Sequence, residues 1–453
     1  MKAQKRFSGF EDLLKTQSKN HYSHTAVIYD EDFKVACSYG ELYDRVLFRS
    51  SQLKSSGKTC IGILADFSFA CIVEIFAANL AGMQIVMLDR TMPAPVLKEL
   101  ITYTDADMLF GNRKQAAELE DALTDGVKDG KGKILFFTSG TTERAKAVVL
   151  TDRSLMSSAY NGSCMLPLKT GDILLSILPL CHVFGFVCGL LWGLSCGASV
   201  ALSRGPRHYT DDCTYFKPTA ISVVPMLLKF LLQYNLMNDE LDLILVGAGD
   251  CAKEILNAVN ATGRRISYGY GLTETSSGVA ISVSGDPSAM EVCPDDEIML
   301  ADDDEILVRA PECMMLGYYK LPEDTEAVLQ DGILFTGDIG QFDADGRLHI
   351  IGRKKEILVL SDGTKIFLPE YIREISNRLH TQEIAVILRK DRPYIVVNDE
   401  RSSEELMDLL GDWIPTLHRD HQPAGIIKYG KDLPRTSTGK IKTWEIAKET
   451  ENL

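Results

Sequence analysis

Apolar and polar residues alternate with two different periods through the first two-thirds of the chain. Residues 59–66 (TCIGILAD) and 84–89 (QIVMLD) form short apolar runs, and residues 68–82 (SFACIVEIFAANLAG) between them form a longer one. The short runs predict buried strands, and the longer run predicts a helix. Because a helix that connects two such strands is typical of a parallel sheet, the pattern predicts an α/β fold class.

The pattern changes near residue 296, where short strands separated by turn residues replace the alternation of strands and helices. Residues 297–310 (EIMLADDDEILVRA) predict a hairpin around an acidic turn. Residues 340–353 (GQFDADGRLHIIGR) predict a second hairpin around Asp345-Gly346. We therefore expect a β-rich subdomain at about 296–352 and a small α+β domain after it.

Residues 173–203 contain no charged side chain and are long enough to cross a bilayer. However, Pro179, His182, four glycines and several serines interrupt the run. Asp172 stands at its N-terminal side, where a membrane span often has a basic flank. We therefore expect a strand, a loop and a buried helix here rather than a membrane span.

The composition is that of a globular protein, with 45% hydrophobic and 25% charged residues in a chain of 453. A net charge of -15 argues against a nucleic-acid partner, because nucleic-acid-binding proteins usually carry a basic face. The eleven cysteines include no CxxC pair, and free thiols in this number are typical of a reducing cytosol. The N-terminal residues contain no apolar segment of a secretory signal, so we expect a cytoplasmic protein.

Two HxxH pairs, His21/His24 and His418/His421, are the sequence-local candidates for metal ligands. We interpret them as solvated histidines, because no cysteine or carboxylate cluster completes either pair as a metal site.

A polar loop between two apolar strands carries the strongest chemical signal. Residues 133–137 and 147–150 predict the strands, and residues 138–146 (TSGTTERAK) contain four hydroxyl side chains, a glycine and a terminal lysine. Hydroxyl and backbone N–H groups donate to phosphate oxygens, glycine permits close approach, and lysine neutralises charge. The loop therefore predicts a polyphosphate site, with a polar β-turn as the alternative. It is not a Walker loop, because no glycine precedes Lys146 and no Ser or Thr follows it.

A second glycine-rich turn, GAGDCA at residues 247–252, lies between a predicted strand and a predicted helix, as in a dinucleotide-binding fingerprint. A nicotinamide site would also need an acidic residue at the end of the next strand, where this chain has Tyr268 and glycines. We therefore interpret the turn as tight strand–helix packing or as a pocket wall.

Four further segments complete the set of motifs, and each alone has an ordinary structural explanation as a turn, a hairpin acid, a charged run or an exposed lysine. They are residues 268–274 (YGYGLTE), 335–338 (FTGD), 352–356 (GRKKE) and 433–441 (LPRTSTGKI). We expect residues 335–338 to end a strand with a lone acid.

In this order the motifs resemble those of the adenylate-forming superfamily, which includes acyl-CoA synthetases, peptide-synthetase adenylation domains and beetle luciferases. The similar segments are residues 138–147 (family pattern TSGTTGxPKG), 270–274 (YGxTE), 336–338 (TGD), 352–356 (GRxKD/E) and 434–440 (PRTxxGK). The resemblance covers essentially the whole chain, and residues 352–372 are most similar to the fatty-acyl branch.

The resemblance implies an N-terminal adenylation domain (1–352) of αβαβα layers, a hinge (353–356) that turns at Lys355, and a mobile C-terminal domain (357–453). It also implies ATP-dependent activation of a carboxylic acid with Mg²⁺. The carboxylate attacks the α-phosphate, which gives an acyl adenylate and pyrophosphate, and the thiol of coenzyme A then displaces AMP. Because the reaction brings anions together, positioning and cationic neutralisation should supply most of the catalysis.

The resemblance also implies roles for individual residues. Tyr270 would stack on adenine, Asp338 and Arg353 would hold the ribose, and Lys440 would bridge the attacking carboxylate and the phosphate. The implied ATP-binding set is Thr138, Ser139, Gly140, Thr141, Thr142, Lys146, Tyr270, Gly271, Thr273, Asp338, Arg353 and Lys440. The implied catalytic residues are Lys440, Glu274 and Thr273, and the implied Mg²⁺ ligands are Thr141 and Glu274. The implied acid pocket consists of His182, Val183, Phe184, Val224, Gly247, Ala248, Gly249, Gly271 and Ser277.

The phosphate loop departs from the family pattern, because Glu143 and Ala147 replace glycines and Ala145 replaces proline. A negative charge at Glu143 disfavours triphosphate binding unless it points away or helps to hold Mg²⁺. Two alternatives to an acyl-CoA ligase therefore stay open: an acyl-carrier-protein ligase that uses the same first step, and a nucleotide-binding homologue with impaired catalysis. The other motifs keep Glu274, Asp338, Arg353 and Lys440, and this argues against the second alternative.

Overall fold

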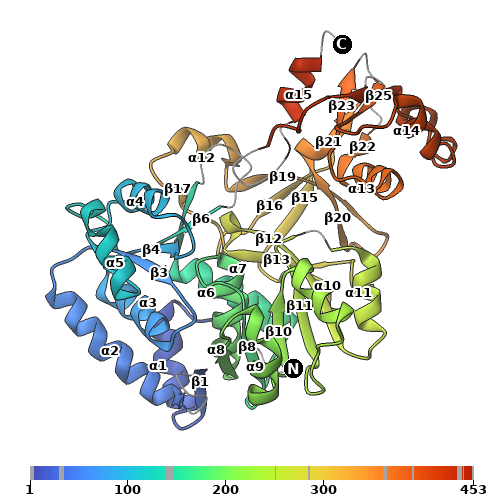
Figure 1. The fold of residues 1–453 in the computed structure, drawn as a ribbon. Helices are drawn as coiled ribbons and strands as arrows, with labels where there is room; N and C mark the ends of the chain where they lie inside the picture. Colours follow the sequence, from blue (N-terminus) through green and yellow to red (C-terminus); the bar gives the residue numbers. More distant parts are fainter. Residues whose placement is uncertain are drawn as a thin grey trace. The chain divides into compact units, whose positions relative to one another are not determined.

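The computed structural model describes residues 5–29, 35–138, 146–249, 251–283, 286–360, 365–389, 392–435, 441 and 443–450 (Figure 1). They form two compact units. The first contains residues 1–301, 306–336 and 341–349, and the second contains 302–305, 337–340 and 350–453. The domain limits expected from the resemblance, with a hinge at 353–356, stay a prediction.

A six-stranded sheet in the first unit carries the phosphate-loop strands. Its order is β17 (Gly317–Tyr318), β7 (Ala147–Thr151), β6 (Lys133–Phe137), β4 (Gln84–Asp89), β3 (Cys60–Ala65) and β5 (Met108–Phe110). Strands β5, β3, β4 and β6 run parallel, whereas β7 pairs antiparallel with β6 and β17 pairs antiparallel with β7. The predicted strand–helix–strand unit is confirmed, because α3 (Phe69–Ala81) connects β3 and β4.

A nine-stranded sheet carries the remaining motifs of the first unit. Its order is β14 (Glu291–Val292), β13 (Ser277–Ile281), β12 (Arg265–Leu272), β11 (Leu243–Val246), β10 (Ala220–Val223), β8 (Ile173–Ser176), β9 (Ser199–Leu202), β1 (Thr25–Tyr29) and β2 (Val35–Ser38). The strands from β12 to β1 in this order are parallel. Strand β12 changes partner along its length: it pairs with β11 as far as Tyr268 and then antiparallel with β13 from Gly269.

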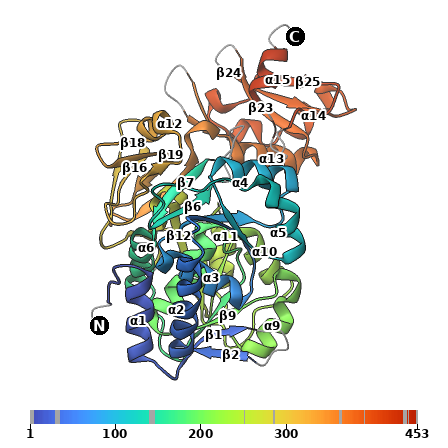
Figure 2. The ribbon, with the colours of Figure 1, turned by 90° about the vertical axis from the view of Figure 1, so that its left-hand side faces the viewer.

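Helices separate and cover the two sheets. Helix α6 (Asp152–Met165) contacts β7 of one sheet and β13 of the other, so it lies between them. Helices α1 (Phe10–Asn20), α2 (Tyr39–Ser55) and α3 lie side by side (Figure 2). The other helices of this unit are α4 (Ala94–Tyr103), α5 (Arg113–Leu119), η1 (Glu120–Ala122), α7 (Val183–Phe186), η2 (Val187–Leu191), α8 (Trp192–Cys196), η3 (Pro206–His208), α9 (Tyr209–Phe216), α10 (Pro225–Gln233), α11 (Lys253–Asn260), η4 (Thr273–Thr275) and α12 (Pro322–Val328).

The uncharged segment at residues 173–203 has the predicted structure. It consists of β8, a loop, the consecutive helices α7, η2 and α8, and then β9. Trp192 at the start of α8 is buried, and its Nε1 donates to Leu166 O at 3.0 Å. Among the residues that the structure describes, no helix has the length and apolar character that a membrane crossing needs.

The β-rich region forms a five-stranded sheet. Its strands are β15 (Glu297–Leu300), β16 (Glu305–Arg309), β19 (Ile333–Phe342) and β18 (Leu329–Gln330) in order, with β20 (Leu348–Arg353) also paired to β19. Both predicted hairpins are confirmed, but the expectation that residues 335–338 end a strand is wrong. Gly337 adopts φ 69°, a left-handed conformation that glycine tolerates, and β19 continues past it to Phe342.

The second unit is an α+β domain, as the sequence predicts. Its sheet has the order β23 (Ile384–Arg389), β24 (Arg392–Val397) and β25 (Gly425–Lys428), and β21 (Ile357–Val359) pairs with β22 (Lys365–Phe367). Its helices are η5 (Lys354–Glu356), α13 (Leu368–Leu379), α14 (Ser403–Leu409), η6 (Ile414–Thr416), η7 (Arg419–His421) and α15 (Thr443–Thr450). Ile375, Leu379, Ile395 and Leu406 are fully buried in its core.

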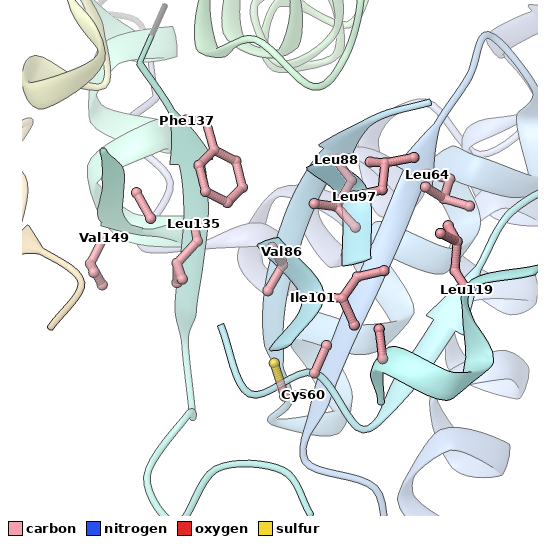
Figure 3. Close-up of a cluster of buried hydrophobic side chains, with 13 residues drawn as sticks. Cys60, Leu64, Val86, Leu88, Leu97, Ile101, Leu119, Leu135, Phe137 and Val149 are labelled. Carbon is pink, nitrogen blue, oxygen red and sulfur yellow. The ribbon is translucent and has the colours of Figure 1, made fainter. Parts of the chain in front are cut away.

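A hydrophobic cluster supports the polar ends of the six-stranded sheet. Leu88, Leu97, Phe137 and Val149 belong to it (Figure 3). Full burial of side chains of this size contributes about 1.5–3 kcal/mol each. Because Asp89 follows Leu88 and Thr138 follows Phe137, the cluster fixes the points at which these two polar residues emerge.

Candidate active site

The predicted phosphate loop closes the hairpin of β6 and β7. Thr138 N donates to Lys146 O at 3.0 Å, and Lys146 N donates to Thr138 Oγ1 at 3.3 Å. These two hydrogen bonds hold both ends of the loop together. The loop residues predicted to bind phosphate and metal, namely Ser139, Gly140, Thr141 and Thr142, lie outside the described residues together with Glu143.

The Lys146 side chain lies in a charged cluster that sequence reasoning missed. Its Nζ is 2.5 Å from Asp324 Oδ1 and 4.7 Å from the centre of the Tyr318 ring. The Tyr318 hydroxyl donates to Glu274 Oε1 at 2.7 Å. Burial and the nearby Glu274 carboxylate raise the pKa of Tyr318, so its hydroxyl stays protonated and remains a donor. Tyr318 thus connects the predicted phosphate lysine to the predicted metal ligand.

Glu274 lies in a strained turn. Thr273 and Glu274 begin η4, and Met315 N donates to Glu274 O at 2.8 Å. The next residues, Ser276 and Ser277, have φ angles of 56° and 116°, which are unusual for residues with a side chain. Ser276 Oγ donates to Cys313 O at 2.7 Å and helps to hold this conformation. Strained turns of this kind cluster at functional sites because the surrounding structure has to fix them.

The nucleotide motif on β12 combines a buried aromatic ring with a required glycine. Tyr270 is 8% exposed. A Cβ at Gly271 would lie 1.8 Å from Ser277 O, so no other residue fits this position without a backbone shift. Gly271 therefore permits the close pairing of β12 with β13 that places Thr273 and Glu274.

The predicted acid-pocket residues gather at the carboxyl ends of parallel strands, where ligands of open α/β sheets bind. A Cβ at Gly247 would lie 2.9 Å from the Phe184 ring, and Gly247 N donates to Val223 O at 3.2 Å. Pro225, which follows Val224, is 3.5 Å from the position of a Cβ at Gly249. These contacts show tight packing at the described residues 247–249, with Ala248 at φ 59°.

Small polar groups lie near Ser277, another of the predicted pocket residues. The Cys188 Sγ lies 3.6 Å from Ser277 Oγ, and burial raises the pKa of Cys188 to about 12. A cavity of about 20 Å³, lined by residues that include Cys188, Trp192 and Leu245, lies next to this pair and has room for about one water. His182 and Val183 stand at the start of α7, with the His182 side chain exposed and Val183 buried.

Two predicted ribose ligands pair with each other in the second unit. Arg353 Nε is 2.8 Å from Asp338 Oδ1, and Asp338 is 4% exposed. The adjacent Lys354 Nζ lies 2.6 Å from Asp303 and 2.7 Å from Glu305, and these carboxylates raise the pKa of Lys354. Lys440 lies outside the described residues.

Comparison with known proteins agrees with the motifs. The family model described as AMP-binding enzyme matches residues 14–135 and 127–319. The chain therefore belongs to the AMP-binding enzyme family, the adenylate-forming group that its motifs resemble.

Curated relatives are CoA ligases with different acids in their names. A long-chain-fatty-acid–CoA ligase from Yersinia pestis is 26% identical over 454 residues, covering 88% of this chain and 78% of the relative. An indoleacetate–CoA ligase from Aromatoleum aromaticum is 26% identical over 472 residues, covering 89% of this chain and 91% of the relative. An O-succinylbenzoate coenzyme A synthetase from Bacillus subtilis, solved with AMP, has a TM-score of 0.75 at 23% identity. The match covers 95% of this chain and 96% of that structure's chain. This last likeness shows the α/β fold with a large N-terminal and a smaller C-terminal domain.

Proposed function

We propose that this protein activates a fatty acid with ATP to an acyl adenylate and transfers the acyl group to the thiol of coenzyme A. The observation that carries the proposal is the connection of Lys146, through Tyr318, to Glu274. Lys146 is a cation that can bind phosphate oxygens, and Glu274 is a carboxylate that can bind a metal. Both contact Tyr318, in a chain that belongs to a family of adenylate-forming enzymes. Structural relatives solved with ATP and magnesium support the same nucleotide and metal for this chain.

The assignment of a fatty acid rests on the chemistry of the pocket. None of the nine predicted pocket residues is a lysine, an arginine or an acid, so the set offers no permanently charged partner for a second charge on the substrate. The contact of Phe184 with Gly247 presents an apolar wall. Relatives that act on long-chain fatty acids, indoleacetate and 2-succinylbenzoate show that the family accepts several acids, and the apolar pocket favours the first class.

Mg²⁺ fits the donor chemistry at Glu274. One oxygen of this carboxylate accepts from Tyr318, which orients the group and leaves its other oxygen for a hard cation. Thr141, the second predicted ligand, lies outside the described residues. When bound, the ion would offset the negative charge of the phosphates.

The protein's own residues would perform the rest of the first half-reaction. Lys146 would leave Asp324 and bind phosphate oxygens, while Asp338 and Arg353, already paired, would present a buried carboxylate and a guanidinium to the ribose hydroxyls. Lys440 would neutralise the charge that grows as the acid attacks the α-phosphate. A carboxylate oxygen bonds to phosphorus as the bond to pyrophosphate breaks, and coenzyme A sulfur then bonds to the acyl carbon as AMP leaves.

We further propose that the second half-reaction requires a turn at Lys355, whose backbone belongs to η5. Proline fixes φ near -65°, so Lys355→Pro should preserve adenylate formation and suppress thioester formation. Equal loss of both steps would contradict a hinge at this residue.

The decisive experiment is pyrophosphate release from ATP with Mg²⁺ and a panel of acids. Straight-chain fatty acids should support turnover, and dicarboxylic acids of equal length should not. Glu274→Gln, which has nearly the same shape, should lose activity with every acid. Preference for a dicarboxylic or aromatic acid would refute the substrate class, and no turnover with any acid would indicate an impaired homologue. Thioester formation with coenzyme A, compared with a holo acyl carrier protein, tests the acceptor.

A further inference from the structure

One group of side chains in the described part of the chain has the composition and spacing of a metal site. Asp89, Cys181 and His182 each contribute one ligand atom, and these atoms lie within 4.8 Å of one another. Asp89 ends β4 of the six-stranded sheet, whereas the other two residues lie in the loop before α7. Neither HxxH pair belongs to this group, so the tertiary structure gathers ligands that no sequence motif predicts.

The spacing is close to that of a bound transition metal. Ligands of a tetrahedral Zn²⁺ lie about 2.0–2.3 Å from the ion, and hence about 3.3–3.8 Å from one another. The three ligand atoms would therefore have to approach one another by at most about 1.5 Å. Because the His182 side chain is exposed, it can make this adjustment without repacking the core.

The Asp89 carboxylate is already oriented, and the backbone of the other two ligands is held by a turn. Thr91 N and Thr91 Oγ1 donate to Asp89 Oδ1 at 2.8 and 2.7 Å, which leaves Oδ2 available. His182 N donates to Pro179 O at 3.2 Å, and this turn fixes the backbone of the Cys181–His182 pair. Within the described residues, the imidazole of His182 makes no hydrogen bond or ion pair. Hydrogen bonds to a ligand, such as those from Thr91 to Asp89, are what orient a ligand in known metal sites.

We propose that Asp89, Cys181 and His182 bind a Zn²⁺ ion, with water in the fourth position. Thiolate and imidazole ligands favour Zn²⁺ over Mg²⁺, which prefers oxygen ligands, so this site differs from the one at Glu274. Binding forms a Zn–S bond and releases the thiol proton to solvent.

The zinc site shares His182 with the predicted acid pocket. Resting on the proposed function, we infer that bound Zn²⁺ removes this imidazole from the pocket wall and inhibits acid activation. Inhibition should compete with the acid and be reversed by a chelator. A protein of this kind would lose activity when free zinc rises and regain it when zinc falls.

The site itself is tested with Co²⁺ as a spectroscopic probe on the full chain, in the absence of ATP and acid. Wild-type protein should bind one Co²⁺ with a thiolate-to-cobalt charge-transfer band and the intense visible bands of four-coordinate cobalt. Cys181→Ser should abolish the charge-transfer band, and Asp89→Asn should weaken binding by about tenfold or more. Thr91→Val keeps all three ligands and the backbone N–H contact to Asp89, and should weaken binding by up to about tenfold, because it removes the hydroxyl that helps to orient Asp89.

Matched controls separate this site from other thiols and histidines. Cys213 on α9 is 3% exposed and Cys181 is 4% exposed, so Cys213→Ser removes an equally buried thiol and should leave the spectrum unchanged. His24→Gln should also leave it unchanged, although the Nδ1 atoms of His21 and His24 lie 3.2 Å apart. Circular dichroism confirms that each variant is folded. An unchanged charge-transfer band in Cys181→Ser, or no band in the wild-type protein, overturns the site.

Activity distinguishes the two parts of the proposal. With the acid held far below its KM, zinc buffered at its own dissociation constant should halve pyrophosphate release by the wild-type protein and leave Cys181→Ser unaffected. Equal inhibition of both proteins, or none of the wild type, overturns regulation at this site. If no acid supports turnover while the cobalt spectrum behaves as expected, the proposed function fails and the metal site stands.

Discussion

Asp324 neutralises Lys146, the lysine at the end of the phosphate loop, across 2.5 Å. The two side chains are 26% and 41% exposed, so the ion pair is partly screened by solvent. A triphosphate must compete with Asp324 for this lysine. The pair therefore sets part of the affinity for ATP, in addition to any effect of Glu143.

Replacing Asp324 by asparagine should strengthen ATP binding. A partly exposed ion pair contributes up to about 1 kcal/mol, so the ATP dissociation constant of Asp324→Asn should fall by up to about fivefold. Isothermal titration calorimetry measures this, with Glu326→Gln as control because Glu326 is an exposed acid on the same helix. Weaker ATP binding in Asp324→Asn would mean that Asp324 positions Lys146 rather than competes for it.

Tyr318→Phe should impair the use of Mg²⁺. Phenylalanine keeps the ring beside Lys146 and removes the hydroxyl that donates to Glu274. Loss of such an orienting contact typically weakens metal binding by about 10–100-fold, so half-maximal pyrophosphate release should need correspondingly more Mg²⁺. In the control Tyr319→Phe, which loses the hydrogen bond to Asp105, the Mg²⁺ dependence should not change. An unchanged dependence in Tyr318→Phe would contradict metal binding by Glu274.

Asp296 should make the folded state less stable at alkaline pH. Burial raises its pKa from 3.8 to about 7, opposed by a hydrogen bond from Asn161 at 2.8 Å. Because the folded state holds the extra proton, the stability that Asp296 contributes is present below about pH 4 and is lost as pH rises to about 7. Asp296→Asn should therefore raise the melting temperature at pH 8 more than at pH 5.

Thermal unfolding at the two pH values tests this directly. The Asp129 side chain is 86% exposed, so Asp129→Asn should change the melting temperature by the same small amount at both pH values. A larger stabilisation by Asp296→Asn at pH 5 than at pH 8 would refute the sign of the shift.

Lys440→Ala should separate the two half-reactions. If Lys440 supplies positive charge during adenylation, its loss should slow pyrophosphate release by about 10²–10³-fold. The variant should still convert a supplied acyl adenylate to thioester at close to the normal rate, with an unchanged melting temperature. Lys442→Ala provides a control two residues away. Normal adenylation in Lys440→Ala, or equal loss of both steps, would refute the assignment.

The sequence by itself determined the elements and the family. Strands β6 and β7 and the loop between them follow from a local contrast between apolar and hydroxyl-rich residues, which needs no distant contact. The same holds for the β15–β16 hairpin, whose acidic turn is encoded in adjacent residues. The order of the five motifs identified the adenylate-forming group, because motif spacing is also a property of the linear chain.

Only the tertiary structure decided which side chains meet. Asp324 is 178 residues from Lys146, and Tyr318 is 44 residues from Glu274, so no local pattern could join them. The end of β19 was misplaced because Gly337 can either stop a strand or bend it, and pairing with neighbouring strands makes the choice. Asp89 and Cys181 approach because the two sheets pack against the helices between them, and such packing depends on side-chain volume across the whole core.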